Sequence, residues 1–103
     1  MAREVAFVTG AAQGIGLATA SRLARDGFRV VAMDRAADVL QTAVAALAAQ
    51  GLNVAAVPCD VCDRAAIAGV IGAEPRVDVM VTAAGIASHA SVLDLSEDEF
   101  RRV

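Results

Sequence analysis

A glycine-rich segment is the first feature of this sequence with a recognisable chemical use. Residues 9–16 read Thr-Gly-Ala-Ala-Gln-Gly-Ile-Gly, directly after one apolar stretch and directly before an amphipathic one. In such a position Gly10 permits a tight turn, Gly14 lets a ligand approach the backbone, and Gly16 allows a helix to pack closely on a sheet. The start of that helix offers free N–H groups and a positive dipole end to a diphosphate. The segment therefore predicts a phosphate-binding loop, since its place between a strand and a helix argues against a purely structural turn.

An acidic residue lies where the ribose of a nucleotide would be bound. Asp34 ends the second apolar stretch, 24 residues after Gly10. A carboxylate at this spacing can accept hydrogen bonds from the adenosine ribose hydroxyls, and it repels the additional 2′-phosphate of NADP. The neighbouring Arg35 could serve such a phosphate instead, whereas Gln13 adds no positive charge to the loop. The sequence therefore favours NAD over NADP, and the alternative for Asp34 is a solvated strand end.

Two cysteines and one histidine are the remaining candidates for site chemistry. Cys59 and Cys62 form a C-x-x-C pair after the third apolar stretch, a pattern that thiol redox proteins also use. A closed zinc site requires four ligands, and His89 is the only other soft candidate. The interpretation we favour is two small apolar residues at a strand end, because buried free cysteine behaves in that way. We expect no metal site, and a redox protein is a minor alternative.

The elements that must position these residues alternate along the chain. Apolar residues at positions 40, 43, 44 and 47 follow helical spacing, and glycines at 27 and 51 mark helix ends. The expected strands are 5–9, 29–34, 53–59 and 77–82, and the expected helices are 15–26, 37–50 and 63–70, followed by a loop over 83–95 and a helix that begins at the capping box Ser96–Glu99. Pro58 fits a strand position where no N–H is needed.

This alternation predicts the fold class. Strands that alternate with helices give right-handed crossovers and a parallel sheet. We expect an α/β fold, a Rossmann-type doubly wound parallel sheet in which the strands 3-2-1-4 are present and the remainder is missing. With 103 residues the chain is one domain, residues 1–103. Because the chain ends about two turns into its last expected helix, we expect this domain to be incomplete at its C-terminal end.

Composition excludes several other classes of protein. The chain is 57% hydrophobic with a mean hydropathy of +0.58, but glycines and polar residues interrupt its uncharged runs, so we expect neither a signal peptide nor a membrane span. The net charge is −3, and the arginines form no basic stripe, so nucleic acid is not an expected partner. These features are typical of a cytoplasmic protein.

Three motifs in order resemble those of the short-chain dehydrogenase/reductase family. The family motif T-G-x-x-x-G-x-G matches residues 9–16, including the preferred Ile15, and its Asp-Val after the third strand matches Asp60-Val61. The resemblance implies that Asp60 binds the adenine amino group and that Val61 packs beside the ring. It covers the whole chain.

The third motif of that family is matched only in part. The family's N-N-A-G after the fourth strand is here Thr82-Ala83-Ala84-Gly85, without either asparagine. The resemblance implies that Ala84 and Gly85 line the path to the nicotinamide and that Ala83 also belongs to the cofactor-binding residues. The hydrogen bonds of the missing amides are then lost or supplied by Thr82.

The resemblance also implies an activity. Members of this family are oxidoreductases that interconvert an alcohol and a ketone or aldehyde with a nicotinamide cofactor, and they usually form homo-oligomers. Their catalytic Ser, Tyr and Lys lie downstream of the segment matched here, and this chain contains no Tyr and no Lys. We therefore expect NAD(H) binding but no catalytic residue within these 103 residues. The alternative is a short non-catalytic nucleotide-binding or interaction module.

Overall fold

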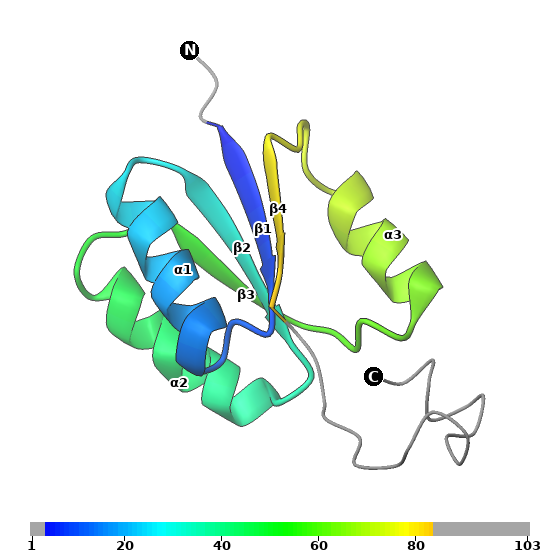
Figure 1. Cartoon of the computed structure of the whole chain (residues 1–103), viewed down its shortest axis with the longest axis horizontal. Helices are drawn as coiled ribbons and strands as arrows, with labels where there is room; N and C mark the ends of the chain where they lie inside the picture. The colour runs from blue at the N-terminus through cyan, green and yellow to red at the C-terminus, as the bar shows by residue number, and fades with distance from the viewer. Residues whose placement is uncertain (1–3, 84–103) are drawn as a thin grey trace, which may run out of the picture.

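The order of strands and helices matches the expected alternation. A computed structural model describes residues 4–83 of the chain (Figure 1). The strands are β1 (Val5–Thr9), β2 (Arg29–Asp34), β3 (Val54–Pro58) and β4 (Val79–Thr82), and the helices are α1 (Gly14–Arg25), α2 (Ala37–Ala48) and α3 (Arg64–Gly72). The loop expected after Ala83 and the capping box expected at Ser96–Glu99 lie outside the described residues.

The four strands form one parallel sheet in the predicted order. The sheet runs β3-β2-β1-β4, and β1 is paired in parallel with both β2 and β4. Every residue of β1 is buried, because strands cover both of its sides and helices cover both of its faces. Pro58 lies on β3 opposite Asp34, at an edge of the described sheet, where its missing N–H costs no ladder hydrogen bond.

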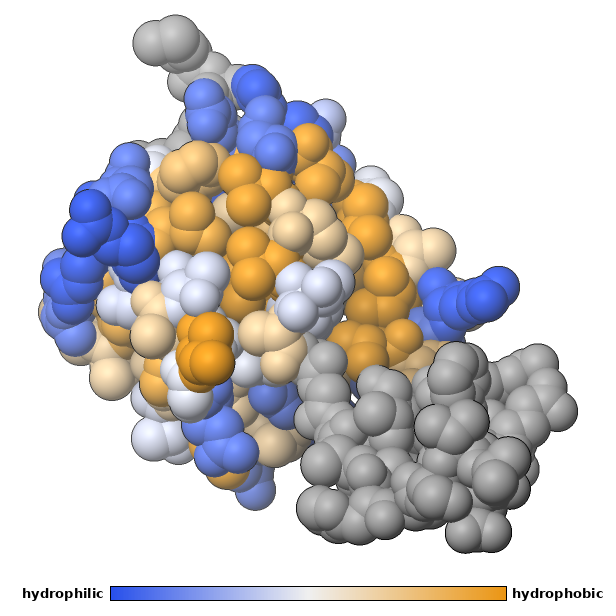
Figure 2. Space-filling model, in the orientation of Figure 1, coloured by the Kyte–Doolittle hydropathy of each residue, from blue (hydrophilic) through white to orange (hydrophobic). Residues whose placement is uncertain are grey.

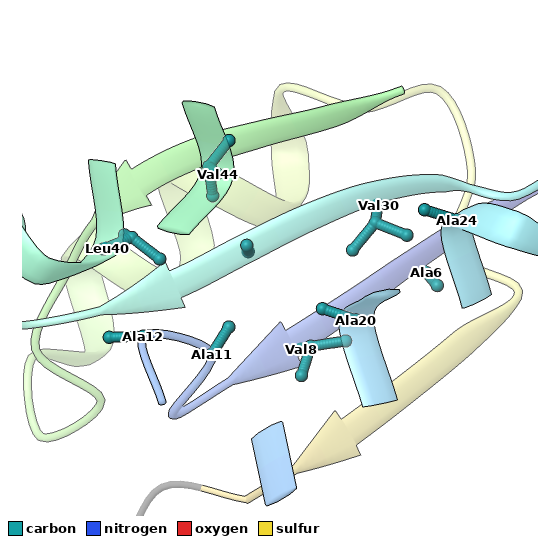
Figure 3. Packing of buried hydrophobic residues seen from close by; sticks show 10 residues of the cluster. Ala6, Val8, Ala11, Ala12, Ala20, Ala24, Val30, Leu40 and Val44 are labelled. Carbon is teal, nitrogen blue, oxygen red and sulfur yellow. The ribbon is translucent and has the colours of Figure 1, made fainter. Parts of the chain in front are cut away.

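The face of the sheet that carries α1 and α2 holds the larger apolar cluster. Ala6 and Val8 of β1 point to this face, where Ala20 and Ala24 of α1 pack on them (Figure 3). Leu40 of α2 belongs to the same cluster and is completely buried. The small alanine side chains let α1 lie close to the sheet.

The opposite face is covered by α3 alone among the described helices. Phe7 of β1 and Met33 of β2 are completely buried there, and Ile67 and Val70 of α3 pack against their cluster. No residue of α3 is itself buried. A groove of about 350 Å³ lies between this helix and the sheet, and Ala55 and other small residues line it. The two faces therefore differ in how tightly they are covered.

The first two strands have the expected limits, whereas the other boundaries differ from the expected ones by at most two residues, and one difference has a clear cause. The fourth strand was expected from residue 77, but β4 begins at Val79. Asp78 precedes it, and its carboxylate accepts the Val5 N–H at 2.7 Å while its own N–H donates to the Val5 carbonyl at 2.9 Å. A side chain thus takes the place of a main-chain acceptor, and the regular ladder starts at Val79, two residues later than expected.

Candidate dinucleotide-binding site

The glycine-rich loop connects β1 to α1 at the carboxyl edge of the sheet. Its Ala11 N–H donates to the carbonyl of Met33 at 3.0 Å, which holds the loop across the end of β2. Ala11 and Ala12 are buried, whereas Gln13 and Ile15 are exposed, Ile15 to 81%. The loop is therefore anchored on its inner side and open to solvent where the helix begins.

The start of α1 has the properties of an anion-binding site. Gln13 is the N-cap residue, but its side chain makes no capping hydrogen bond, and no acidic residue lies in the first turn. Gly14 has φ +60°, and a Cβ added to it would meet nothing within 4 Å. The space over Gly14 is open, so a diphosphate can reach the first N–H groups of the helix. The residues present thus fit the diphosphate of a dinucleotide.

Gly16 has a different partner from the expected one. We predicted that it allows α1 to pack on the sheet, but a Cβ on Gly16 would lie 1.9 Å from the carbonyl oxygen of Gly10. The close approach is therefore between the helix and the first residue of its own loop. Gly10 itself has φ +66°, as expected for a tight turn. Both glycines are needed for the same reversal of the chain.

Asp34 lies beside the loop and is fastened to it. The residue is half-buried at the end of β2, where its Oδ2 accepts the Ala12 N–H at 3.2 Å and its Oδ1 accepts the Ala36 N–H at 3.0 Å. The carboxylate is therefore fixed by two backbone N–H groups, although the residue is still partly exposed to solvent. Arg35 follows as an exposed side chain that makes no ion pair with any residue between 4 and 83.

Sequence reasoning missed the bond from Ala12 to Asp34. The bond to Ala36 was within reach of the sequence, since Asp side chains often accept the N–H two residues ahead. The bond to Ala12 joins residues that are 22 positions apart, and no local pattern indicates it.

Asp60 and Val61 follow β3 at the same edge of the sheet. The Cys59 N–H donates to the Asp34 carbonyl at 3.0 Å, which places Asp60 next to the end of β2. Asp60 is exposed, and its Oδ1 accepts the Cys62 N–H at 2.9 Å. Val61 is 43% exposed. Both side chains are thus open to solvent beyond Asp34, on the side of the sheet edge away from β4.

Only the first two residues of the last motif, Thr82 and Ala83, are described. Thr82 pairs with Thr9 across β4 and β1, so the exposed Ala83 comes directly after the strand end that lies beside the glycine loop. Ala84 and Gly85 lie outside the described residues. The structure thus brings together Gly10, Gln13, Gly14, Ile15, Gly16, Asp34, Arg35, Asp60, Val61 and Ala83 at one edge of the sheet.

The two cysteines have different environments. Cys59 is buried, and burial raises the pKa of its thiol, with the carboxylates of Asp63 and Asp60 acting in the same direction. Cys62 is exposed, so only one of the two is the small buried residue that we expected. Both thiols are free. A redox-active thiol needs a lowered pKa, so the raised pKa of Cys59 argues against the redox interpretation.

Among residues 4–83, no group of three or more His, Cys, Asp or Glu side chains is placed to hold a metal ion. Within the same range, no helix has the length and apolar character that a membrane crossing requires.

Comparison with known proteins agrees with these features. The family model described as short chain dehydrogenase matches residues 4–103. A curated relative, 2,3-dihydro-2,3-dihydroxybenzoate dehydrogenase of Bacillus subtilis (strain 168), is 38% identical over 101 residues, which are 94% of this chain and 39% of the relative. The chain therefore spans about four tenths of the length of such a relative.

Two solved structures are similar over almost the whole chain. A metagenomic short-chain oxidoreductase in complex with NADP has a TM-score of 0.83 and 33% identity, covering 96% of this chain and 47% of that one. A short-chain dehydrogenase from Mycobacterium paratuberculosis bound to NAD has a TM-score of 0.77 and 31% identity, covering 97% of this chain and 43% of that one. With the family model matched from residue 4 to residue 103, the chain belongs to the short-chain dehydrogenase family of oxidoreductases.

Proposed function

We propose that residues 1–103 are the dinucleotide-binding domain of an NAD(H)-dependent oxidoreductase that interconverts an alcohol and a ketone or aldehyde. The observation that carries this proposal is the open N-terminus of α1 next to the Asp34 carboxylate. The N-terminus of α1 offers hydrogen-bond donors for a diphosphate, and the Asp34 carboxylate offers acceptors for ribose hydroxyls. A dinucleotide carries these two groups next to each other.

Each site residue has a role in this proposal. The N–H groups after Gln13 hold the diphosphate over Gly14, and Ile15 borders it. Asp34 accepts hydrogen bonds from the adenosine ribose, with Arg35 beside it. Asp60 and Val61 contact the adenine. Ala83, Ala84 and Gly85 line the path to the nicotinamide, and Gly10 and Gly16 shape the loop. When bound, the cofactor supplies the carbon that accepts or donates a hydride.

The preference for NAD rests on charge. The 2′-phosphate of NADP would lie next to the negatively charged Asp34, and two like charges at such a distance repel. Arg35 follows Asp34 directly in the chain, and it is exposed. Solved relatives include complexes with NADP and with NAD, so support for NAD comes from Asp34 and not from the comparisons.

A titration of the chain with NAD and with NADP tests the choice of cofactor. The chemical shifts of amide groups in a 10.4 kDa protein report binding even at millimolar dissociation constants. We expect NAD to bind more tightly than NADP and to shift the amides of Gly14 and Gly16. Asp34→Ser should bring the affinity for NADP closer to that for NAD. Asp26→Asn removes one negative charge at the far end of α1 and should leave the ratio of the two affinities unchanged. Equal binding of NADP by the unmodified chain contradicts the proposal.

An exchange of segments tests the enzymatic part. Residues 1–103 would replace the corresponding segment of the Bacillus subtilis dehydrogenase, which retains its own catalytic half. We expect this hybrid to oxidise that enzyme's substrate with NAD, and the 103-residue chain alone to show no activity, since it contains neither Tyr nor Lys. A folded hybrid that binds NAD without activity favours the alternative, a non-catalytic nucleotide-binding module.

We also propose a cytoplasmic homo-oligomer with a small-molecule substrate and with no nucleic acid or membrane partner. Apolar side chains gather on the surface along β4 and toward α3 (Figure 2). Met80 on β4 is 43% exposed and Val77 before it is 46% exposed. Exposed apolar surface beside a strand that lacks a further neighbour favours pairing with another chain, so we expect the 103-residue chain to associate with itself. Sedimentation velocity over a range of concentrations tests this, and a monomer at all concentrations contradicts it.

A further inference from the structure

The Asp34 carboxylate makes two contacts that the ribose role does not require. One oxygen accepts the N–H of Ala12 in the glycine loop, and the other accepts the N–H of Ala36 at the start of α2. Ala36 is the N-cap residue of α2, and its own side chain makes no capping bond. One side chain thus connects the loop before α1 with the turn before α2.

The loop is held from two consecutive residues of β2. The carbonyl of Met33 accepts the Ala11 N–H at 3.0 Å, and the Asp34 side chain accepts the next N–H, that of Ala12, at 3.2 Å. Figure 3 shows Ala11 and Ala12 on the loop, among the residues of the buried cluster. Since Ala12 is only 3% exposed, its N–H has little access to water if Asp34 releases it.

We infer that Asp34 is a positioning residue for the phosphate loop as well as the proposed ribose ligand. A carboxylate has about four acceptor positions, so after two backbone bonds each oxygen retains one for a ribose hydroxyl. The two N–H groups fix the orientation of the carboxylate before any ligand arrives. The carboxylate therefore cannot rotate away from the 2′-phosphate of NADP without releasing the loop that is proposed to bind the diphosphate.

This inference deepens the proposed function and rests on it for the identity of the ligand. The anchoring itself is a property of the ligand-free chain. A substitution at Asp34 should therefore weaken the diphosphate site in addition to changing the selectivity between NAD and NADP. A residue that acts only on the ribose would leave the diphosphate site unchanged.

Amide hydrogen exchange of the ligand-free 103-residue chain tests the anchoring. Asp34→Asn retains one carbonyl oxygen, but its NH₂ group cannot accept, so one of the two N–H groups loses its partner. Asp34→Ala releases both. We expect exchange at Ala12 and Ala36 to accelerate about tenfold or more in Asp34→Ala, with a smaller change in Asp34→Asn and none at Phe7 in β1. Asp26→Asn serves as the control for the loss of one negative charge.

The affinity for inorganic pyrophosphate is a second measurement, and the direction in which it changes distinguishes loss of charge from loss of the loop anchor. Removal of a negative charge by itself strengthens the binding of an anion, whereas a loosened loop weakens it. We expect the affinity of Asp34→Asn for pyrophosphate to fall several-fold relative to that of Asp26→Asn. Unchanged exchange at Ala12, or tighter pyrophosphate binding, overturns the inference. If exchange accelerates as expected but the unmodified chain binds no NAD, the anchoring stands and the proposed function fails.

Discussion

Replacement of Gly16 by alanine tests how tightly α1 is joined to its loop. The added Cβ would lie 1.9 Å from the carbonyl oxygen and 2.6 Å from the carbonyl carbon of Gly10. Real Cβ atoms essentially never approach a neighbour within 3.0 Å, so helix and loop must separate by about 1.1 Å. Both atoms belong to the backbone, and no rotation of a side chain can relieve the contact.

The expected cost follows from two opposing effects. Forced overpacking costs about 1–3 kcal/mol, while alanine is favoured over glycine in a helix by up to about 1 kcal/mol. Gly16 lies in the first turn of α1, where the favourable contribution is small, so we expect a net loss of about 1–2 kcal/mol in the free energy of unfolding. A displacement of this size in the phosphate loop should also weaken NAD binding by about tenfold or more.

Urea denaturation followed by circular dichroism measures the stability, and titration with NAD measures the binding. The matched control is Gly69→Ala in α3, where an added Cβ meets nothing within 4 Å. That variant should be unchanged or about 0.5–1 kcal/mol more stable. If Gly16→Ala equals the control in stability and binds NAD like the unmodified chain, the close contact between α1 and Gly10 does not exist.

Three further substitutions or treatments have defined outcomes. Gly14→Val should weaken NAD binding more than tenfold. The φ of +60° at Gly14 disfavours a β-branched residue by about 1–2 kcal/mol, and the valine side chain would enter the open space proposed for the diphosphate. Normal folding and normal NAD affinity of this variant would contradict the placement of the loop. A thiol reagent near neutral pH should label the exposed Cys62 much faster than Cys59, whose thiol is buried with a raised pKa, and equal rates in mass spectrometry would refute this. The pKa of Asp78 is lowered, first by its hydrogen bond from Arg76, so its stabilising contribution is present above about pH 4 and is lost as the pH falls through the folded-state pKa. Asp78→Asn should accordingly be less stable than the unmodified chain at pH 6, and the difference between their urea midpoints should shrink toward pH 3. A difference that stays constant with pH would show that the charge of Asp78 does not contribute to stability.

The sequence by itself determined the architecture. The alternation of apolar strands and amphipathic helices predicted the parallel sheet in the order 3-2-1-4, and β2 has the predicted limits, residues 29–34. These features are local, since the period of apolar residues and the glycines at helix ends depend on neighbours within about four positions. The glycine motif was likewise found from its place between a strand and a helix, and the turn at Gly10 has the expected positive φ.

The tertiary structure decided which residues contact one another at the site. The partner of Gly16 is the Gly10 carbonyl, Asp34 is bound to the Ala12 N–H, and Asp78 replaces a main-chain acceptor for Val5. The last two contacts join residues 22 and 73 positions apart, at opposite edges of the sheet, and they form only once β1 has paired with β2 and with β4. Distances of this kind depend on the register of the sheet and on the depth to which α1 packs on the small side chains beneath it. No periodic pattern in the chain encodes them, which is why the loop anchor was not found from the sequence.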